Sequence, residues 1–211
     1  MKIIIFGPQG SGKGTQAELI ARTHSLPYIS TGDIFRYNIK NKTDLGSKVE
    51  AHISAGELVP DELTNEIVKD RLTQPDCEVG FVLDGYPRNK DQQNYLGSIT
   101  AIDYAIVIEV SDEAAAQRLG DRLACKCGMS YHKKFNPPKH KGKCDKCGGE
   151  LYKRDDDKPE AIKKRIEIYH QQTEPLYSFY NSQKVLYKVD GEKSIDEVYH
   201  QIDRVIHREK K

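Results

Sequence analysis

The sequence predicts an α/β protein built on a parallel β-sheet with helices on both faces. Short apolar runs of strand length recur along the 211-residue chain and alternate with longer segments whose apolar residues have helical spacing. This alternation is typical of parallel sheets, whose strands are buried on both faces and are connected by helices. A glycine-rich loop between the first apolar run and the first helical segment is a second indication, because such loops occur where a parallel strand passes into a helix.

The first half of the chain supplies two strands and two helices of this pattern. A strand is expected at residues 2–6, and a helix over residues 15–21 follows the glycine-rich loop. Helical spacing returns over residues 62–72, and the apolar run at residues 80–83 predicts a second central strand.

The second half repeats the alternation. Residues 104–108 predict a third central strand, residues 113–123 a helix, and residues 184–189 a strand nearer the edge of the sheet. The last helix is the clearest, because Ser194 and Glu197 form a capping box ahead of an apolar stripe that we interpret as core packing. That stripe consists of Ile195, Val198, Ile202, Val205 and Ile206.

Two polar segments do not fit the alternation. Residues 30–59 are helical in pattern, with a turn at residues 41–43 and Gly56 closing a helix. Residues 121–157 contain four cysteines and many lysines. We interpret both as insertions that project from a core domain made of residues 1–29, 60–120 and 158–211.

The glycine-rich loop predicts a phosphate-binding site. From Gly7, four residues lead to Gly12 and Lys13, as in the pattern G-x-x-x-x-G-K-[ST], although Gly14 takes the hydroxyl position and Thr15 comes one residue later. Glycines let backbone N–H groups point at phosphate oxygens, and the lysine reaches the terminal phosphates. The sequence therefore predicts that the chain binds a nucleoside polyphosphate.

Composition excludes several classes of partner. Lys and Arg total 33 against 32 Asp and Glu, so net charge gives no reason to expect nucleic acid or a membrane surface as a partner. No apolar run approaches the roughly 20 residues that span a bilayer, and the N-terminus enters a strand without a signal peptide. Five cysteines, four of them between Cys125 and Cys147, favour a metal site in a reducing compartment over a disulfide framework. We therefore expect a cytoplasmic enzyme.

Four motifs then appear in a recognisable order. They are residues 7–15, Ser30-Thr31-Gly32-Asp33, Asp84-Gly85-Tyr86-Pro87-Arg88 and Tyr131-His132-x-x-Phe135-Asn136-Pro137-Pro138. In these motifs the chain resembles the long form of the adenylate kinase family, with a zinc-bearing lid, and the likeness runs from Met1 to about Arg208. The resemblance implies a P-loop NTPase-like core, with residues 30–59 as the domain that binds the nucleoside monophosphate and residues 121–157 as the lid over ATP. It implies reversible, Mg²⁺-dependent phosphoryl transfer, in which ATP and AMP give two ADP, and thus a part in purine nucleotide homeostasis. A monomer is the common state of the family, and a small homo-oligomer stays open.

The resemblance also assigns site residues. Phosphoryl transfer depends on positioning and on cations that stabilise spread charge, and arginine suits this because its planar fork grips phosphate. The residues expected to act in catalysis are Lys13, Arg88, Arg122, Arg154 and Arg165. Those expected to contact ATP are Gly10, Ser11, Gly12, Lys13, Gly14, Thr15, Arg118, Arg122, Ser130, Tyr131 and Lys193. Those expected to contact AMP are Thr31, Arg36, Glu57, Leu58, Val59, Gly85, Tyr86, Pro87, Arg88, Gln92, Arg154 and Arg165.

Three of these residues have expected individual functions. Arg118 would stack under the ATP adenine, and Gln92 would read the adenine edge of AMP, since an amide donates and accepts at once. The Asp84 carboxylate would orient water ligands of Mg²⁺ without contacting the ion itself, and its alternative function is to cap a helix or turn. Asp33 is a weaker candidate for the same function, because it can cap a helix beginning near Ile34.

The cysteines predict a structural zinc site with one irregularity. Cys144 and Cys147 form a C-x-x-C knuckle, whereas Cys125 and Cys127 form C-x-C in place of the usual C-x-x-C. We favour four thiolate ligands. The alternatives are three thiolates with His132, His140, Asp145 or water, and four free thiols. Cys77 is expected to be a buried thiol.

Two departures from the family pattern and two rival functions stay open. Asp121 and Leu123 replace a glycine and an arginine at the expected lid hinge, and Gln9 is unusual within the phosphate loop.

A nucleoside monophosphate kinase for UMP, CMP or GMP, or one with a broad NTP donor preference, is the nearer rival. A zinc-ribbon protein that binds nucleic acid through the lysine-rich lid is the more distant one.

Overall fold

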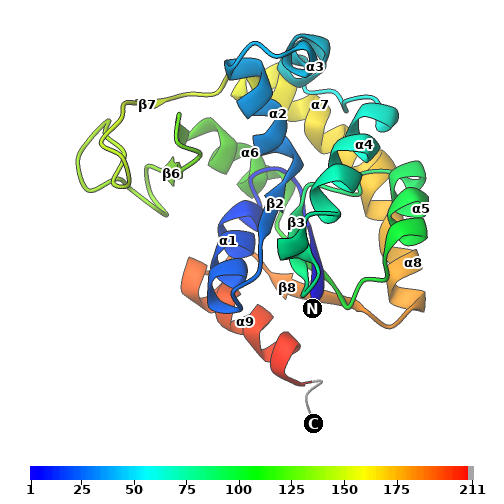
Figure 1. The fold of residues 1–211 in the computed structure, drawn as a ribbon. Coiled ribbons are helices and arrows are strands. Elements are labelled where there is room, and N and C mark those ends of the chain that lie inside the picture. The colour runs from blue at the N-terminus through cyan, green and yellow to red at the C-terminus, as the bar shows by residue number, and fades with distance from the viewer. Residues whose placement is uncertain (209–211) are drawn as a thin grey trace.

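The computed structural model describes residues 1–208, so residues 209–211 of the expected core domain lie outside the described part. A five-stranded sheet with strand order β2-β3-β1-β4-β8 forms its centre (Figure 1). The strands are β1 (Lys2–Phe6), β2 (Tyr28–Ser30), β3 (Phe81–Asp84), β4 (Tyr104–Glu109) and β8 (Leu186–Asp190). All four pairings are parallel, and β8 lies at one edge, as predicted for residues 184–189.

Helices cover both faces of this sheet. On one face, α1 (Lys13–Thr23) and α9 (Ile195–Arg208) pack on Ile3 and Ile5 of β1. On the other, α4 (Asp61–Leu72), α5 (Lys90–Ile99) and α8 (Tyr177–Ser182) pack on Ile4 and Phe6. Figure 1 shows these two groups of helices on opposite sides of the strands. Alternate residues of one strand thus enter two different cores, as a doubly covered parallel sheet requires. The predicted fold class is confirmed.

Residues 30–59 contain a helical hairpin. Helix α2 (Thr31–Lys40) and helix α3 (Asp44–Ser54) are joined by a tight turn in which Lys42 has a positive φ. Their own small core consists of Phe35, Val49 and Val59. The turn predicted at residues 41–43 is confirmed, and so is the helix end predicted at Gly56, which follows the C-cap of α3 with a positive φ.

Residues 122–152 contain a separate three-stranded antiparallel sheet. Its strands are β5 (Arg122–Cys125), β6 (Ser130–His132) and β7 (Leu151–Tyr152), in the order β6-β5-β7. The segment extends away from the central sheet in Figure 1. Helix α6 (Asp112–Gly120) leads into it, and α7 (Pro159–Ile168) leads out.

Two local expectations were wrong. The helix expected over residues 113–123 ends at Gly120, because Leu123 pairs with Tyr131 in the antiparallel sheet instead. Asp33 does not cap α2, since the helix begins at Thr31 and the Ser30 hydroxyl accepts the hydrogen bond from the Asp33 N–H.

The short helical segments that complete the described chain are η1 (Pro75–Cys77), η2 (Asp155–Asp157), η3 (Tyr169–Thr173) and η4 (Glu174–Leu176), of which η3 is a π-helix. Among residues 1–208, no helix combines the length and apolar character needed to cross a bilayer.

Candidate active site

The phosphate loop joins β1 to the N-terminus of α1. Gly12 is the N-cap of α1 and has φ 92°, and Gly10 has φ 91°. Both values lie in the left-handed backbone region, which residues other than glycine adopt only with strain. A Cβ on Gly10 would also lie 2.4 Å from the Ala115 carbonyl oxygen. The loop therefore depends on glycine at both positions, and it presents backbone N–H groups at a helix N-terminus, where anions bind.

Lys13 is the first residue of α1, and its side chain turns back over the loop. Its Nζ donates a hydrogen bond to the Pro8 carbonyl oxygen at 3.2 Å. The pKa of Lys13 is lowered to about 8, mainly by burial; Asp84 opposes this shift, and nearby arginines contribute to it. A bound phosphate would restore the full charge, because an anion stabilises the protonated amine.

One wide pocket opens on this loop. All residues expected to contact ATP line it, namely Gly10, Ser11, Gly12, Lys13, Gly14, Thr15, Arg118, Arg122, Ser130, Tyr131 and Lys193. The pocket therefore runs from the phosphate loop to the antiparallel sheet and to the start of α9.

The far wall of the wide pocket contains an aromatic residue that the sequence analysis did not assign to ATP. The Arg118 guanidinium lies 4.9 Å from the centre of the Phe135 ring, a cation–π distance. Tyr131 also lines the pocket, but its side chain is buried and its hydroxyl donates to or accepts from Cys144 Sγ at 3.4 Å. Tyr131 thus connects the pocket wall to the cysteine cluster.

A second, smaller pocket lies between the α2–α3 hairpin and the sheet. Of the residues expected to contact AMP, those that line it are Thr31, Arg36, Glu57, Leu58, Val59, Gly85, Arg88, Gln92 and Arg165. Tyr86, Pro87 and Arg154 do not line this pocket, and Arg154 lines the wide one instead. Tyr86 is buried in the core, where its hydroxyl donates to Asn65 Oδ1 at 2.6 Å.

Two side chains of the smaller pocket are already engaged with protein partners. The Glu57 carboxylate accepts from Lys164 Nζ at 2.6 Å and contacts His52, so it is held at the edge of the pocket. Gln92 accepts from the Arg88 N–H at 2.8 Å and donates to Asp61 Oδ1 at 2.7 Å. One amide N–H and one acceptor lone pair of Gln92 are then left for a base.

The backbone of Arg88 is fixed by a residue that the sequence analysis missed. Thr173, the last residue of the π-helix η3, donates from Oγ1 to the Arg88 carbonyl oxygen at 2.7 Å. The Arg88 side chain also donates to the Gly85 carbonyl oxygen at 2.7 Å. π-helical turns concentrate at functional sites, but nothing in the local sequence announces this one.

Acidic residues after the antiparallel sheet hold the arginines apart. Arg122 forms a two-pronged ion pair with Asp157, while Arg165 pairs with Asp156 at 3.1 Å and with Asp157 at 3.5 Å. Neither Asp156 nor Asp157 was predicted from the sequence, although the acidic run directly after Arg154 is a visible signal. These carboxylates offset part of the repulsion between neighbouring guanidinium groups.

The electrostatic balance nevertheless favours an anion. Burial lowers the pKa of Arg154 to about 9, and it lowers the pKa of Arg165 to about 10, in both cases assisted by neighbouring arginines. The Arg154 Nε is buried without a hydrogen-bond partner in the part of the chain that the structure describes. The cations are thus crowded and incompletely paired, which is the arrangement that binds phosphates.

Asp84 ends β3 and faces the phosphate loop. Its Oδ2 accepts from the Tyr28 hydroxyl at 3.2 Å, whereas its Oδ1 is buried without a partner among residues 1–208. Burial raises the pKa of Asp84, and Lys13 and Arg88 work against that rise. A carboxylate with a free, buried oxygen beside a phosphate loop fits the binding of Mg²⁺-coordinated water.

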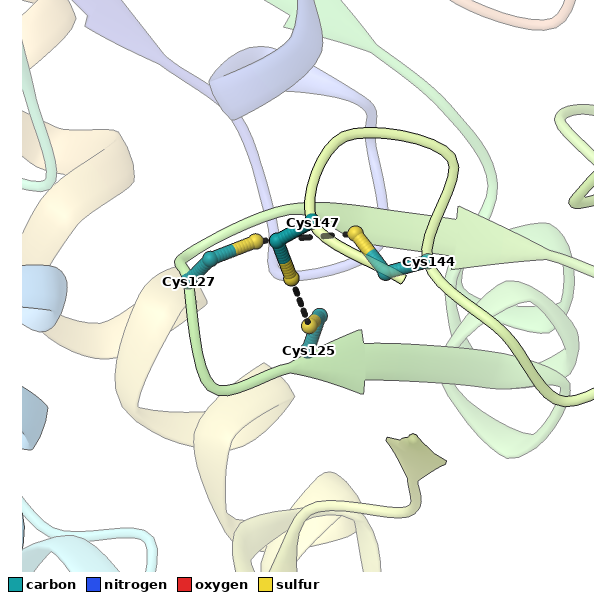
Figure 2. Close-up of side chains that lie close together, drawn as sticks. All are labelled: Cys125, Cys127, Cys144 and Cys147. Carbon is teal, nitrogen blue, oxygen red and sulfur yellow. Dashed lines mark hydrogen bonds between the residues drawn. The ribbon is translucent and has the colours of Figure 1, made fainter. Parts of the chain in front are cut away.

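The four clustered cysteines converge on one point of the antiparallel sheet (Figure 2). The Sγ atoms of Cys125, Cys127, Cys144 and Cys147 all lie within 4.8 Å of one another. Cys125 at the end of β5 approaches Cys147 at 3.4 Å, and Cys127 approaches Cys144 at 3.5 Å. The C-x-C spacing therefore brings both of its sulfur atoms to the knuckle. The fifth cysteine, Cys77, is buried, as expected.

At the expected lid hinge, the backbone does not require the glycine that Asp121 replaces. Asp121 follows α6 with φ −100°, a conformation open to any residue, and its carboxylate pairs with Lys133 Nζ at 2.8 Å.

Comparison of the sequence with known proteins identifies its family. The family model described as adenylate kinase matches residues 5–185. An adenylate kinase of Agathobacter rectalis is 53% identical over 94% of this chain and 96% of its own length. Adenylate kinases of Methanosarcina barkeri and Clostridium botulinum are each 48% identical, over 98% of both chains and over 100% of both chains, respectively.

The chain belongs to the adenylate kinase family. Membership makes it a phosphotransferase of the nucleoside monophosphate kinase type, which uses ATP with Mg²⁺. The adenylate kinase family is thus the one that the four motifs of the sequence indicated.

The lowered pKa of Lys13 predicts a pH dependence. In the free enzyme, kcat/KM for MgATP should fall as pH rises through about 8, because the depressed pKa removes the lysine charge there. The kcat value should hold to higher pH, since bound phosphates raise that pKa. Steady-state kinetics across pH would test both limbs. Lys13→Arg is the matched control, because arginine keeps its charge and should abolish the fall near pH 8. Identical pH profiles of kcat/KM for the wild type and Lys13→Arg would show that Lys13 does not cause the fall near pH 8.

Proposed function

We propose that the chain catalyses the reversible transfer of the terminal phosphoryl group of MgATP to AMP, with ATP in the wide pocket and AMP in the smaller one. One observation carries this arrangement. The two pockets meet along a shared wall, here called the seam, which consists of Gln9, Gly32, Arg36, Gly85, Arg88 and Arg165. Three guanidinium groups at the junction of two pockets suit the meeting of two phosphate chains.

The reaction balances without an added proton donor or acceptor. An oxygen of the AMP phosphate forms a bond to the γ-phosphorus of ATP, and the bond from that phosphorus to the β–γ bridging oxygen breaks. The electron pair stays on the departing ADP, so the total charge of the two nucleotides is conserved. The protein therefore contributes position and fixed positive charge rather than acid–base chemistry.

The side chains divide this work. Lys13 and the phosphate loop hold the ATP phosphates, Arg36 and Arg88 hold the AMP phosphate, and Arg122, Arg154 and Arg165 surround the group in transit. Mg²⁺ bound with ATP would neutralise phosphate charge, and Asp84 would orient its water ligands through the unpartnered Oδ1.

Adenine is the base that the smaller pocket favours. The remaining N–H and lone pair of the Gln92 amide match a base edge that both donates and accepts, and Thr31 lines the same pocket. The relatives' names favour the same base over UMP, CMP or GMP. Faster turnover of GMP than of AMP in a comparison of the four monophosphates would overturn this choice.

We also propose a structural zinc ion held by the four clustered cysteines. A tetrahedral site with Zn–S bonds of about 2.3 Å places its sulfurs about 3.8 Å apart, and the observed range of 3.4 Å to within 4.8 Å brackets that value. His132 Nδ1 and Asp145 Oδ1 instead accept hydrogen bonds from backbone N–H groups, which favours thiolates as the ligands. Such a closed shell supplies folding stability and no open position for reaction.

The geometry supports a division of labour within the chain. We propose that residues 30–59 act as the AMP-binding domain, that residues 121–157 act as the lid, and that residues 1–29, 60–120 and 158–208 form the core. Since both pockets are built within a single chain, a monomer suffices for this activity. The five cysteines form no disulfide, which suits a reducing compartment such as the cytoplasm.

Removal of a cation from the transfer site should affect turnover most. Lys13→Ala and Arg88→Ala should each lower kcat for ADP formation by about a hundredfold or more, because each removes charge stabilisation realised mainly in the transition state. A coupled assay with ATP and AMP measures this. Lys69→Ala, at an exposed position of α4, is a matched control that should stay near wild type. Near-normal activity of Arg88→Ala would contradict the proposed AMP site.

Loss of the Thr173 hydroxyl should weaken the binding of AMP more than that of ATP. Thr173→Val removes the hydrogen bond to the Arg88 carbonyl oxygen at nearly constant volume, so KM for AMP should rise by about threefold to tenfold while KM for ATP changes little. Thr173→Ser keeps the hydroxyl and should restore AMP binding. Equal effects of Thr173→Val on both nucleotides would argue for general destabilisation instead.

Zinc content should depend on the irregular cysteine. Cys125→Ser should lower the zinc that copurifies with the protein and lower its melting temperature, because a structural site stabilises the fold that contains it. Elemental analysis and thermal unfolding measure the two effects. Cys77→Ala, outside the cluster, should keep its zinc. Retention of a full complement of zinc by Cys125→Ser would favour a site with three thiolates.

A further inference from the structure

The seam between the two pockets contains one neutral polar side chain that the reaction described above leaves unused. Its other members are glycines and arginines, whereas Gln9 is an amide that enters from the phosphate loop. Every residue of the seam lines both pockets. Gln9 is therefore placed where the phosphate chains of donor and acceptor would meet.

The Gln9 amide is also incompletely paired. Its Oε1 is buried, and within residues 1–208 it has no hydrogen-bond partner. Buried polar atoms in folded proteins are nearly always paired, so a buried acceptor without a partner needs an explanation. Donors line the same two pockets, since the guanidinium groups of Arg36, Arg88 and Arg165 belong to the seam.

The loop fixes the backbone from which the Gln9 side chain projects. The Ser11 N–H donates to the Pro8 carbonyl oxygen at 3.1 Å and closes a turn around residues 9 and 10. Gly10 packs directly against the Ala115 carbonyl group, which leaves the loop no room to shift in that direction. Gln9 thus projects from a rigid turn, as a group that must align with a reacting atom should.

We propose that Gln9 is a further catalytic residue, whose amide N–H donates a hydrogen bond to an oxygen of the phosphoryl group in transit while its Oε1 accepts from a guanidinium group of the seam. This inference rests on the proposed reaction. Phosphate oxygens only accept hydrogen bonds, whereas a carboxamide both donates and accepts, so it can link a phosphate to an arginine. A neutral donor also aligns the group without adding a further cation to the crowded seam.

The bond changes are those of the proposed transfer. The hydrogen bond from Gln9 follows the phosphoryl oxygen as the phosphorus moves from the β–γ bridging oxygen to the AMP phosphate oxygen, and Gln9 itself gains or loses no proton. Its contribution is therefore greatest where charge spreads over the transferring oxygens, which is in the transition state.

Gln9→Met tests this proposal, because methionine has a similar length and shape but no N–H donor. We expect kcat for ADP formation to fall by about tenfold or more, with KM for ATP and AMP each within about twofold of wild type. Gln9→Glu should be more severely impaired, since a carboxylate repels phosphate. Its kcat relative to wild type should recover as pH is lowered, because a protonated carboxyl group is again a neutral donor. Gln74→Met, the same substitution at an exposed glutamine, is the matched control and should behave as wild type.

The outcomes separate this inference from the reaction on which it rests. No ADP formation by the wild-type protein would refute the proposed function itself. A fully active wild type with an equally active Gln9→Met variant would overturn only the catalytic assignment of Gln9. A Gln9→Met variant that loses thermal stability or affinity for a nonhydrolysable ATP analogue, with unchanged kcat at saturation, would also overturn it, because the amide would then act on the loop and not on the transfer.

Discussion

The confinement of many positive charges around one small volume is the constraint on which the rest of this structure depends. Lys13 and several arginines converge on the junction of two pockets, where burial and mutual repulsion lower the pKa values of Lys13, Arg154 and Arg165. Such a cluster costs folding free energy until anions arrive. The free site therefore favours the binding of anions. Two nucleotides, with several phosphates between them, are ligands that offset the repulsion between these cations.

The fold offsets this cost with partners that can be exchanged. Asp156 and Asp157 hold Arg122 and Arg165 by ion pairs, and backbone carbonyl oxygens of the phosphate loop and of Gly85 accept from Lys13 and Arg88. Each of these partners keeps a cation oriented without neutralising the whole cluster. Phosphates can replace the contacts of Lys13 and Arg88 with carbonyl oxygens, because charge-assisted hydrogen bonds to an anion are stronger than bonds to a neutral carbonyl group.

Rigid parts of the molecule surround this site, and more open parts reach over it. The phosphate loop is fixed by its glycines, and η3 anchors Arg88 through Thr173. By contrast, the antiparallel sheet with the cysteine cluster extends from the core (Figure 1) and touches the α2–α3 hairpin through a long contact from Lys40 Nζ to the Lys126 carbonyl oxygen at 3.4 Å. The two insertions thus approach each other across the mouth of the cleft. If residues 121–157 act as the proposed lid, their closure over bound nucleotides would exclude water, which otherwise competes with AMP for the phosphoryl group.

The sequence by itself determined the features that local patterns encode. The strand–helix alternation, the phosphate loop, the helical hairpin of residues 30–59 and the crowding of cysteines all follow from residue types at short separations, which fix backbone conformation directly. Only the tertiary structure decided which distant side chains meet. In the folded chain, Tyr86 packs in the core, and Thr173 of the π-helix donates a hydrogen bond to the Arg88 carbonyl oxygen. Arg122 pairs with Asp157, and Arg165 pairs with Asp156. Cys125 lies next to Cys147. The ends of the helices followed the same rule, since Leu123 left its predicted helix to pair with Tyr131. These outcomes depend on side-chain directions set by packing between elements far apart in the chain, and no local spacing records them.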